Sequence, residues 1–457
     1  MSREVTPARA LAYATLRETF EEGAFTERAF RAGAEREGLE GRERAQAQRL
    51  AYGAVQRRGT ADAAIERLAK RSTRLLDPPV LAALRLGLYE LLFADGTPDH
   101  AAVDQAVELC KRGGAAHASG LVNAVLRRAA REREQLTAAL LGDDSTPAAA
   151  AVAHSVPPWL AEMWWQELGP DSARSLLASC NQPAPVAMRV RGERDPLLAK
   201  LREAGVEAEP ATGPWPLATP ETIAITGRTG DTVPALVAAG ELTPQSRGSA
   251  AVVEVLDPAP GEHLLDLCAG PGIKTGQIAA RTDDRGELIS VELDPERAGE
   301  VAAQAQRLGL RSVTVIEADA TKMELAPEFD RVLLDAPCSD LGALASRPDA
   351  RWRKSPKAIA RMVEVQGAAL LAAARVLRPG GTLVYSTCTI SRRENEERVA
   401  ALLAASATGE VPPLQLEDLG ARAPELASAA EPRCLQLRPD RDRTTGFFIA
   451  RLTRPTA

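Results

Sequence analysis

The chain has 457 residues, of which 45% are hydrophobic and 26% charged, a composition typical of a folded protein and not of a disordered one. This length suggests roughly two to four domains. The formal net charge of −6 at pH 7 argues against a chain that is basic over its whole surface, although it leaves room for a local basic groove.

The N-terminus and the cysteines narrow the class of protein further. Charges stand where a signal peptide needs an apolar core, and no apolar run approaches the ~18 residues of a membrane span, so we expect a cytoplasmic protein with no membrane partner. The six cysteines contain no CxxC pair and the four histidines are scattered. The sequence therefore predicts neither a disulfide framework nor a metal site.

Residues 1–140 predict an all-α bundle. Apolar residues recur at helical spacing, and period-two alternation is missing. Asp77-Pro78-Pro79 is typical of a helix start, and Gly113-Gly114 of a break between helices. Residues 142–147 then form a plausible linker.

Residues 148–248 predict a small α+β linking domain. Further helices are expected up to residue 182, around Trp159, Trp164 and Trp165. After them we expect a strand over 186–191, a helix over 195–205 and a second strand from Val206.

Residues 249–457 alternate strands and helices, which predicts an α/β domain with a Rossmann-like parallel sheet covered on both faces. Ligands then bind at the carboxyl ends of the strands. The expected strands are 263–267, 288–292, 312–316, 331–335 and 383–386; the expected helices begin at 273, 296, 358 and 394, and a hairpin over 434–438 and 446–452 ends the chain.

The turn at residues 266–275, with the sequence DLCAGPGIKT, follows a strand and opens a helix. Gly270 and Gly272 allow the backbone to approach a bound molecule closely, and the helix N-terminus offers N–H donors for a carboxylate. The pattern is not GxGxxG, so a dinucleotide is not the first choice. Lys274 either lines the pocket or lies exposed on its helix. The predicted contacts of the turn are Cys268, Ala269, Gly270, Pro271, Gly272, Ile273 and Lys274.

Acidic residues end the next two strands. Glu292 lies where a carboxylate can accept both ribose hydroxyls of a nucleoside, and Asp319 lies where an adenine amino group is expected. The alternative is a doubly wound domain with a glycine turn and chance acids. Because the three features occur in order, we favour S-adenosylmethionine as the cofactor.

Two cysteines follow two adjacent strands, in Asp335-Ala-Pro-Cys338 and Ser386-Thr-Cys388. Either alone is usually a small buried hydrophobe, but two beside a cofactor turn favour covalent chemistry. Cytosine C5 is a poor nucleophile, and a thiolate that adds to C6 makes C5 enamine-like, so that it can attack an electrophilic methyl group. Asp335 stands where a carboxyl group can hold N3 and the exocyclic amine.

These motifs give the C-terminal half a resemblance to the Sun/Nop-type RNA cytosine-C5 methyltransferases. In that family the Thr-Cys cysteine is the nucleophile and the Pro-Cys cysteine assists release of the RNA. The resemblance implies that Cys388 is the nucleophile and Cys338 the release residue, with Asp335 also bordering the cofactor and Lys274 completing the catalytic set. The matching segments are DLCAGPG (266–272), LDAPC (334–338), RPDARW (347–352), the helix through Gln366, LRPGGTLVYSTC (377–388), ENEE (394–397) and GFF (446–448).

The N-terminal part resembles the NusB-like RNA-binding bundle, through residues 49–57, 84–92, 100–103 and 120–127. The fusion of the two parts implies methylation of one 16S rRNA cytosine, position 967 in conventional numbering, in a single-stranded or looped region. The chain departs from the usual family pattern at Gly270 and Ile273, and at Asp340, where Cys-Ser-Gly-x-Gly becomes Cys-Ser-Asp-Leu-Gly.

Two basic clusters are candidates for RNA contact. The first is Lys111, Arg112, Arg127, Arg128, Arg131 and Arg133, for which an ion-paired solvated face is an equal alternative. The second surrounds Trp352, and we expect phosphate contact there. It consists of Arg347, Arg351, Arg353, Lys354, Lys357 and Arg361.

Three other functions stay open at this point. The chain could act on another RNA cytosine, or be a DNA cytosine methyltransferase that uses Cys338, although the Pro-Cys-Gln and Glu-Asn-Val motifs of that family are missing. It could also be a non-catalytic rRNA-binding assembly factor, an idea that the bulk of Ile273 in the cofactor turn motivates.

Overall fold

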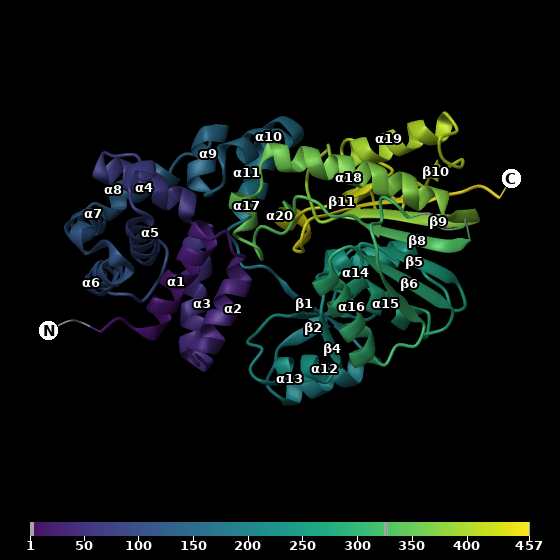
Figure 1. Cartoon of the computed structure of the whole chain (residues 1–457), viewed down its shortest axis with the longest axis horizontal. Coiled ribbons are helices and arrows are strands. Elements are labelled where there is room, and N and C mark those ends of the chain that lie inside the picture. The colour runs from purple at the N-terminus through teal and green to yellow at the C-terminus, as the bar shows by residue number, and fades with distance from the viewer. Residues whose placement is uncertain (1–3, 324–325, 327, 457) are drawn as a thin grey trace. The chain divides into compact units, whose positions relative to one another are not determined.

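The computed structural model describes residues 4–323, 326 and 328–456 (Figure 1). Contacts divide the chain into two compact units, Met1–Gln182 with Leu344–Arg353, and Pro183–Ala343 with Lys354–Ala457. The three domains predicted as 1–140, 148–248 and 249–457 stay a prediction. Among the described residues, no helix has both the length and the apolar character needed to cross a bilayer.

The first unit is helical, as the sequence predicts. Asp77 precedes a helix that begins at Pro78, and Gly114, at φ +91°, interrupts the chain between two helices. The predicted helix start at Asp77-Pro78-Pro79 and the predicted break at Gly113-Gly114 are therefore confirmed. The helices are α1 (Pro7–Glu21), α2 (Thr26–Arg36), α3 (Gly41–Gln56), α4 (Arg58–Ala69), α5 (Pro78–Leu92), α6 (Asp99–Cys110), α7 (Ser119–Arg131), α8 (Arg133–Leu141), α9 (Pro147–Ala153), α10 (Pro158–Leu168), α11 (Pro170–Ser179) and α17 (Ala350–Arg353).

The second unit begins with a small antiparallel sheet in the order β2-β3-β1-β4. Its strands are β1 (Val186–Val190), β2 (Ala208–Pro210), β3 (Thr222–Ile225) and β4 (Leu242–Pro244), and its helices are α12 (Arg194–Glu203) and α13 (Thr232–Ala238). The predicted α+β segment is confirmed.

The larger sheet has the order β10-β12-β9-β8-β5-β6-β7, with β11 paired to β12. The central strands are parallel, as predicted, but β12 pairs antiparallel with β9 and makes the sheet mixed. Its strands are β5 (His263–Leu267), β6 (Glu287–Glu292), β7 (Val313–Glu317), β8 (Phe329–Asp335), β9 (Leu377–Thr387), β10 (Gln415–Leu416), β11 (Leu435–Leu437) and β12 (Phe447–Thr453).

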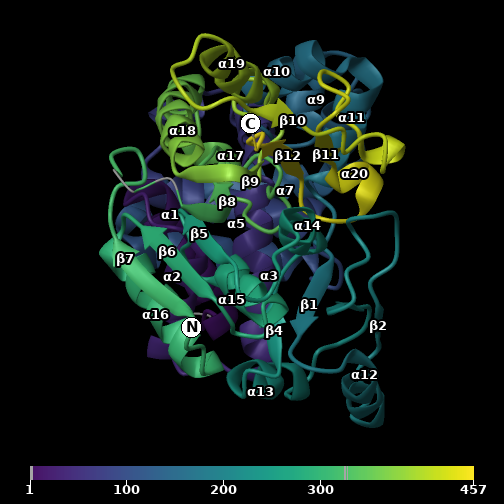
Figure 2. The same cartoon turned by 90° about the vertical axis from the view of Figure 1, so that its right-hand side faces the viewer.

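Helices cover both faces of this sheet because its strands are apolar on both sides. Figure 2 shows α18 (Pro356–Arg375) and α19 (Glu396–Ala407) on one side of the strands, and α15 (Ile273–Arg281) and α16 (Pro295–Leu308) on the other. Val332 and Leu334 of β8 pack with α18, whereas Leu333 packs with α14 (Arg247–Leu256) and α15. Because β5 to β9 pair in parallel, the carboxyl ends of these five strands lie at the same edge of the sheet.

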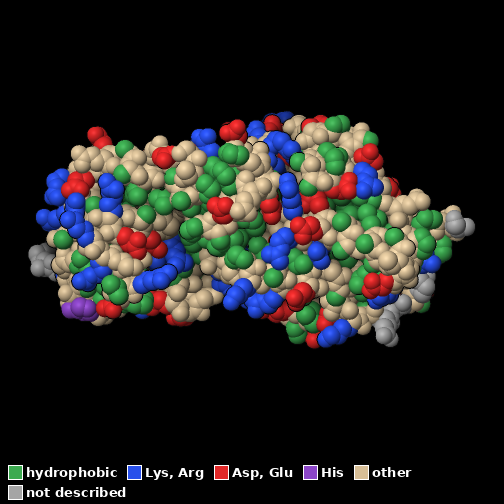
Figure 3. All heavy atoms as spheres, turned by 90° about the horizontal axis from the view of Figure 1, so that it is seen from above, with side chains coloured by type: hydrophobic (Ala, Val, Ile, Leu, Met, Phe, Trp, Pro, Cys, Tyr) green, Lys and Arg blue, Asp and Glu red, His purple; other side chains and the backbone are tan. Residues whose placement is uncertain are grey.

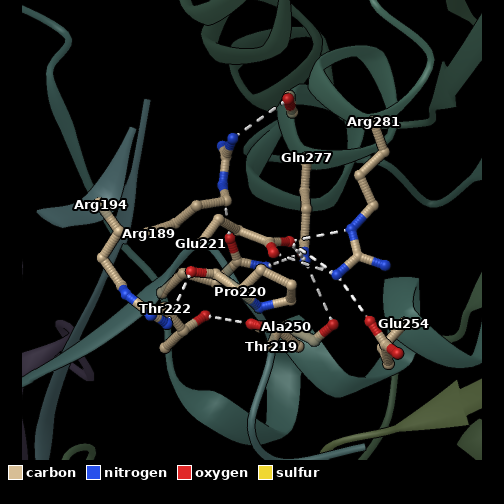
Figure 4. A network of polar contacts seen from close by, with 12 residues as sticks. Arg189, Arg194, Thr219, Pro220, Glu221, Thr222, Ala250, Glu254, Gln277 and Arg281 are labelled. Carbon is tan, nitrogen blue, oxygen red and sulfur yellow. Dashed lines mark hydrogen bonds and ion pairs between the residues drawn. The ribbon is translucent and has the colours of Figure 1, made fainter. Parts of the chain in front are cut away.

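A buried polar network joins the small sheet to the first turns of α15 (Figure 4). Arg189 of β1 is 4% exposed; its guanidinium donates to Gln245 Oε1 at 2.8 Å and to the Gly276 carbonyl at 3.2 Å. Burial lowers the pKa of Arg189 to about 10. Glu221 accepts hydrogen bonds from Gln277 and Arg281 of the same helix. Arg189 thus holds the first turn of α15, and Glu221 holds its last turn through Arg281.

We predict that Arg189→Met lowers the free energy of unfolding by about 2–4 kcal/mol, because it leaves buried acceptors without their charged donor. Arg194→Met is the matched control, since this side chain is 31% exposed and donates to the Pro220 carbonyl at the rim of the same network. It should cost less than about 1 kcal/mol. Urea denaturation of the full chain measures both free energies of unfolding. Equal decreases for the two variants would show that the buried Arg189 contributes no more to stability than the exposed Arg194.

Candidate active site

The glycine turn lies between β5 and α15, at the carboxyl edge of the sheet. The Gly270 N–H donates to Glu292 Oε2 at 2.9 Å, and a Cβ at this position would lie 2.6 Å from that same oxygen. Gly272 has φ +91°, a conformation that favours glycine. Ile273 is the first residue of α15 and is not among the residues with positive φ. Cys268 takes a positive φ, and burial raises its pKa to about 12.

The two predicted acids end neighbouring parallel strands, but they differ in surroundings. Glu292 is buried, and its carboxylate accepts the N–H groups of Gly270, Leu293 and Asp294. Asp319 is half-buried and accepts from the hydroxyl and the N–H of Thr321, which hold its pKa below the usual range.

Asp266, at the base of the turn, is a site residue that the sequence reasoning quoted without a role. It is 1% exposed; Oδ2 accepts from Thr275 at 2.6 Å, while Oδ1 has no partner among the described residues. Burial raises its pKa to about 7. An unpartnered buried carboxylate oxygen beside two glycines and Glu292 fits a ligand with hydrogen-bond donors, as S-adenosylmethionine has.

Cys338 and Cys388 meet, as the sequence predicts. Their Sγ atoms lie 3.4 Å apart, and Cys388 Sγ donates to Asp340 Oδ1 at 3.0 Å. Contact with the Cys338 thiol, together with burial, raises the pKa of Cys388 well above its ordinary value. The donor atoms of Cys338, Asp340 and Cys388 lie within 4.8 Å of one another, and the absence of a metal stays a prediction.

Asp335 and Lys274 lie beside this pair and contact each other. Lys274 Nζ donates to Asp335 Oδ2 at 2.6 Å, and Ser386 Oγ donates to Asp335 Oδ1 at 2.7 Å. The Lys274 ammonium also lies 5.0 Å from the centroid of the Phe447 ring. Of the two alternatives for Lys274, the structure supports the pocket.

A second carboxylate that the sequence quoted without a role braces the loop after Cys338. Glu394 is fully buried and accepts from the N–H of Ser339 at 2.9 Å and from Gln366 Nε2 at 3.2 Å. Burial raises its pKa. The sequence analysis quoted both the ENEE segment, which contains Glu394, and the helix through Gln366. Their contact could not be predicted, because only the fold brings the two segments together.

The prediction of phosphate contact is wrong for Arg351, and it stays a prediction for the other basic residues around Trp352. Arg351 is buried within the helical unit and donates to the carbonyls of Ser155 at 3.0 Å and Cys180 at 2.8 Å. Trp352 Nε1 donates to the Val55 carbonyl at 2.7 Å. The buried Arg351 and the partly buried Trp352 fasten residues 344–353 to the helices of this unit.

The first basic cluster is largely ion-paired. Arg128 pairs with Glu132 at 3.0 Å, Arg133 pairs with Asp99, and Lys111 pairs with Glu108 at 3.5 Å. Figure 3 shows basic and acidic side chains interspersed on the face that it draws. The solvated-face alternative is therefore favoured for this cluster.

Three family models match the chain. The 16S rRNA methyltransferase RsmB/F model matches residues 253–453, the NusB family model residues 6–131, and the ferredoxin-like domain of RsmF/B-like methyltransferases residues 156–216.

Relatives match over nearly the whole chain. The probable ribosomal RNA small subunit methyltransferase B of Synechocystis is 33% identical, over 97% of this chain and 99% of its own, and that of Bacillus subtilis is 32% identical, over 88% of each. The solved structure of PH0851 shares the fold, with a TM-score of 0.79, 24% identity and coverage of 99% and 100%. NSun6 from Pyrococcus horikoshii with SFG has a TM-score of 0.56 and 22% identity, and covers 66% of this chain and 98% of its own.

The family models and the relatives show that the chain is an S-adenosylmethionine-dependent RNA methyltransferase. Of the functions left open by the sequence, this finding favours the RNA methyltransferase over the DNA methyltransferase and the non-catalytic assembly factor. The chain belongs to the ribosomal RNA small subunit methyltransferase B family, whose NusB-like and methyltransferase parts it carries in the same order.

We predict that Gly270→Ala weakens S-adenosylmethionine binding roughly tenfold or more, because the new Cβ displaces the Glu292 carboxylate. Gly299→Ala is the matched control. Gly299 lies within α16 with open space around its Cβ position, so the substitution should leave the affinity unchanged. Calorimetric titration measures both affinities, and equal affinities would show that Gly270 is not part of the cofactor site.

Proposed function

We propose that this enzyme methylates C5 of cytosine 967 in 16S rRNA through a transient bond between Cys388 Sγ and C6 of the base. The observation that carries the proposal is the 3.4 Å separation of the Cys338 and Cys388 sulfur atoms beside Asp335. A reaction that adds one thiol and then eliminates it needs two proton-transferring groups at one ring.

The turn at residues 268–274, with Glu292, Asp319 and Asp335, holds S-adenosylmethionine in this proposal. When bound, the cofactor supplies the electrophilic methyl group. The unpartnered Oδ1 of Asp266 adds an acceptor at the base of the same pocket.

The protein residues act on the base in sequence. Cys388 adds to C6, and Asp335 holds N3 and the exocyclic amine while negative charge develops on the ring. Lys274, at 2.6 Å from Asp335, keeps this carboxyl group oriented. Once C5 carries the methyl group, a base takes the C5 proton, the C–H electron pair re-forms the C5–C6 double bond, and the S–C6 pair returns to Cys388; Cys338 assists this release.

The target follows from the two parts of the chain. The relatives are named for the small-subunit RNA, and a NusB-like bundle precedes the methyltransferase part. A base can reach the two thiols only when it is unstacked, which supports a single-stranded or looped region as substrate.

We predict that Cys388→Ala reduces methylation to background and that Cys338→Ala accumulates a covalent protein–RNA adduct, because addition then proceeds without efficient elimination. Denaturing electrophoresis with labelled rRNA and a methyl-transfer assay measure the two effects. Cys434→Ala is the control, since this cysteine is buried in the core next to β11. Normal turnover of Cys338→Ala would refute the assigned roles.

The target base is tested separately by bisulfite sequencing of 16S rRNA from a strain without this gene. We expect loss of one 5-methylcytosine, at position 967, and its return with the intact gene but not with Cys388→Ala. Loss of 5-methylcytosine at another position would support the same reaction but show that the target base is not cytosine 967.

A further inference from the structure

The Cys388 thiol faces a carboxylate that the proposed mechanism does not use. Cys388 Sγ donates to Asp340 Oδ1 at 3.0 Å, closer than its 3.4 Å contact with the other sulfur. A carboxylate in direct contact with a thiol hydrogen is the arrangement that general-base activation of a nucleophile requires.

The loop that carries Asp340 is fixed against Cys388 at several points. The Gly342 N–H donates to the Cys388 carbonyl at 3.0 Å, and the Ala343 N–H donates to the Asp340 carbonyl at 3.0 Å. Lys354 Nζ lies 3.5 Å from Asp340 Oδ2 and donates to the Cys338 carbonyl at 3.1 Å. The carboxylate is therefore held in place by charge and by backbone geometry.

Asp340 also occupies a backbone conformation that favours glycine. Its φ is +58°. Asp is among the non-glycine residues that enter this region most readily, so the backbone here accommodates an aspartate. The side chain points at the reacting sulfur.

The other nearby carboxylate is already engaged. Asp335 accepts from Lys274 at 2.6 Å through one oxygen and from Ser386 at 2.7 Å through the other. The titratable groups that face Cys388 are Cys338, Asp335 and Asp340, and Lys274 and Lys354 face the two carboxylates.

A thiol in these surroundings is protonated at neutral pH, because the neighbouring thiol, burial and the nearby carboxylates all raise the pKa of Cys388. Its reactive form, the thiolate, is then scarce. Attack of the Cys388 sulfur on a pyrimidine therefore needs a group that accepts the thiol proton while the S–C6 bond forms.

We propose that Asp340 accepts the Cys388 thiol proton as the sulfur attacks C6 of the cytosine, which makes Asp340 a catalytic residue. The inference rests on the proposed function. The S–H bond breaks as the S–C6 bond forms, the proton moves to Oδ1 of Asp340, and the C5–C6 π electron pair moves to C5, where it is delocalised through C4 toward N3. On elimination the S–C6 pair returns to sulfur, and Asp340 returns the proton.

The test compares Asp340→Asn with the parent chain in two measurements. The first is the rate at which iodoacetamide alkylates Cys388 at pH 7, read by peptide mass spectrometry. Asn keeps the size of the side chain but cannot take a proton, so alkylation should slow. If Asp340 acted only by repelling the thiolate, its neutralisation would speed alkylation; an equal or faster rate overturns the proposal.

The second measurement is the single-turnover rate of RNA adduct formation in the Cys338→Ala background. Asp340→Asn should lower this rate roughly 100-fold at pH 7, and the deficit should shrink about tenfold per pH unit as thiolate becomes available. An unchanged rate and pH profile would overturn the proposal. A third outcome separates the two proposals. If Asp340→Asn slows alkylation, but the Cys338→Ala chain with Asp340 intact forms no RNA adduct, the proposed function fails. The role of Asp340 as proton acceptor then stands.

Two further variants control for folding. Asp283→Asn substitutes another aspartate of the same unit at positive φ, +52°, and should leave both rates unchanged. Asp340→Gly fits the backbone at φ +58° and removes the carboxylate, so it should show the same two deficits even if the Asn variant folds poorly.

Discussion

The pairing of β8 with β9 is the constraint on which the site depends. The two strands are parallel with Asp335 opposite Ser386, so the residues that follow them leave the same edge of the sheet side by side. The register places Cys338 and Cys388, fifty positions apart in sequence, at 3.4 Å from one another. A shift of one residue would turn alternate side chains to the opposite face and separate the thiols.

Buried carboxylates organise the loops at this edge. Glu292 closes the glycine turn by accepting N–H groups from two segments, and Glu394 fixes the loop after Cys338 in the same way. Both are buried, where an unpaired charge would be costly, and both are satisfied by backbone or amide donors. Each therefore holds a loop that would otherwise be free to move at the reacting centre.

The helical unit takes in a segment from the middle of the methyltransferase sequence. Residues 344–353 leave the catalytic unit after Ala343 and return to it at Lys354, whose ammonium contacts Asp340 and the Cys338 carbonyl. The buried guanidinium of Arg351 secures the segment.

The sequence by itself determined the helical N-terminal part, the small α+β segment, nearly all strands of the large sheet and the two cysteines, because apolar periodicity, glycine turns and strand-end motifs are local signals. It misjudged Arg351, since a basic run has the same sequence pattern whether its guanidinium contacts phosphate or backbone carbonyls. It also gave no role to Asp266, Asp340 and Glu394. Those roles depend on hydrogen bonds between distant segments and on burial, which arise only when the chain packs.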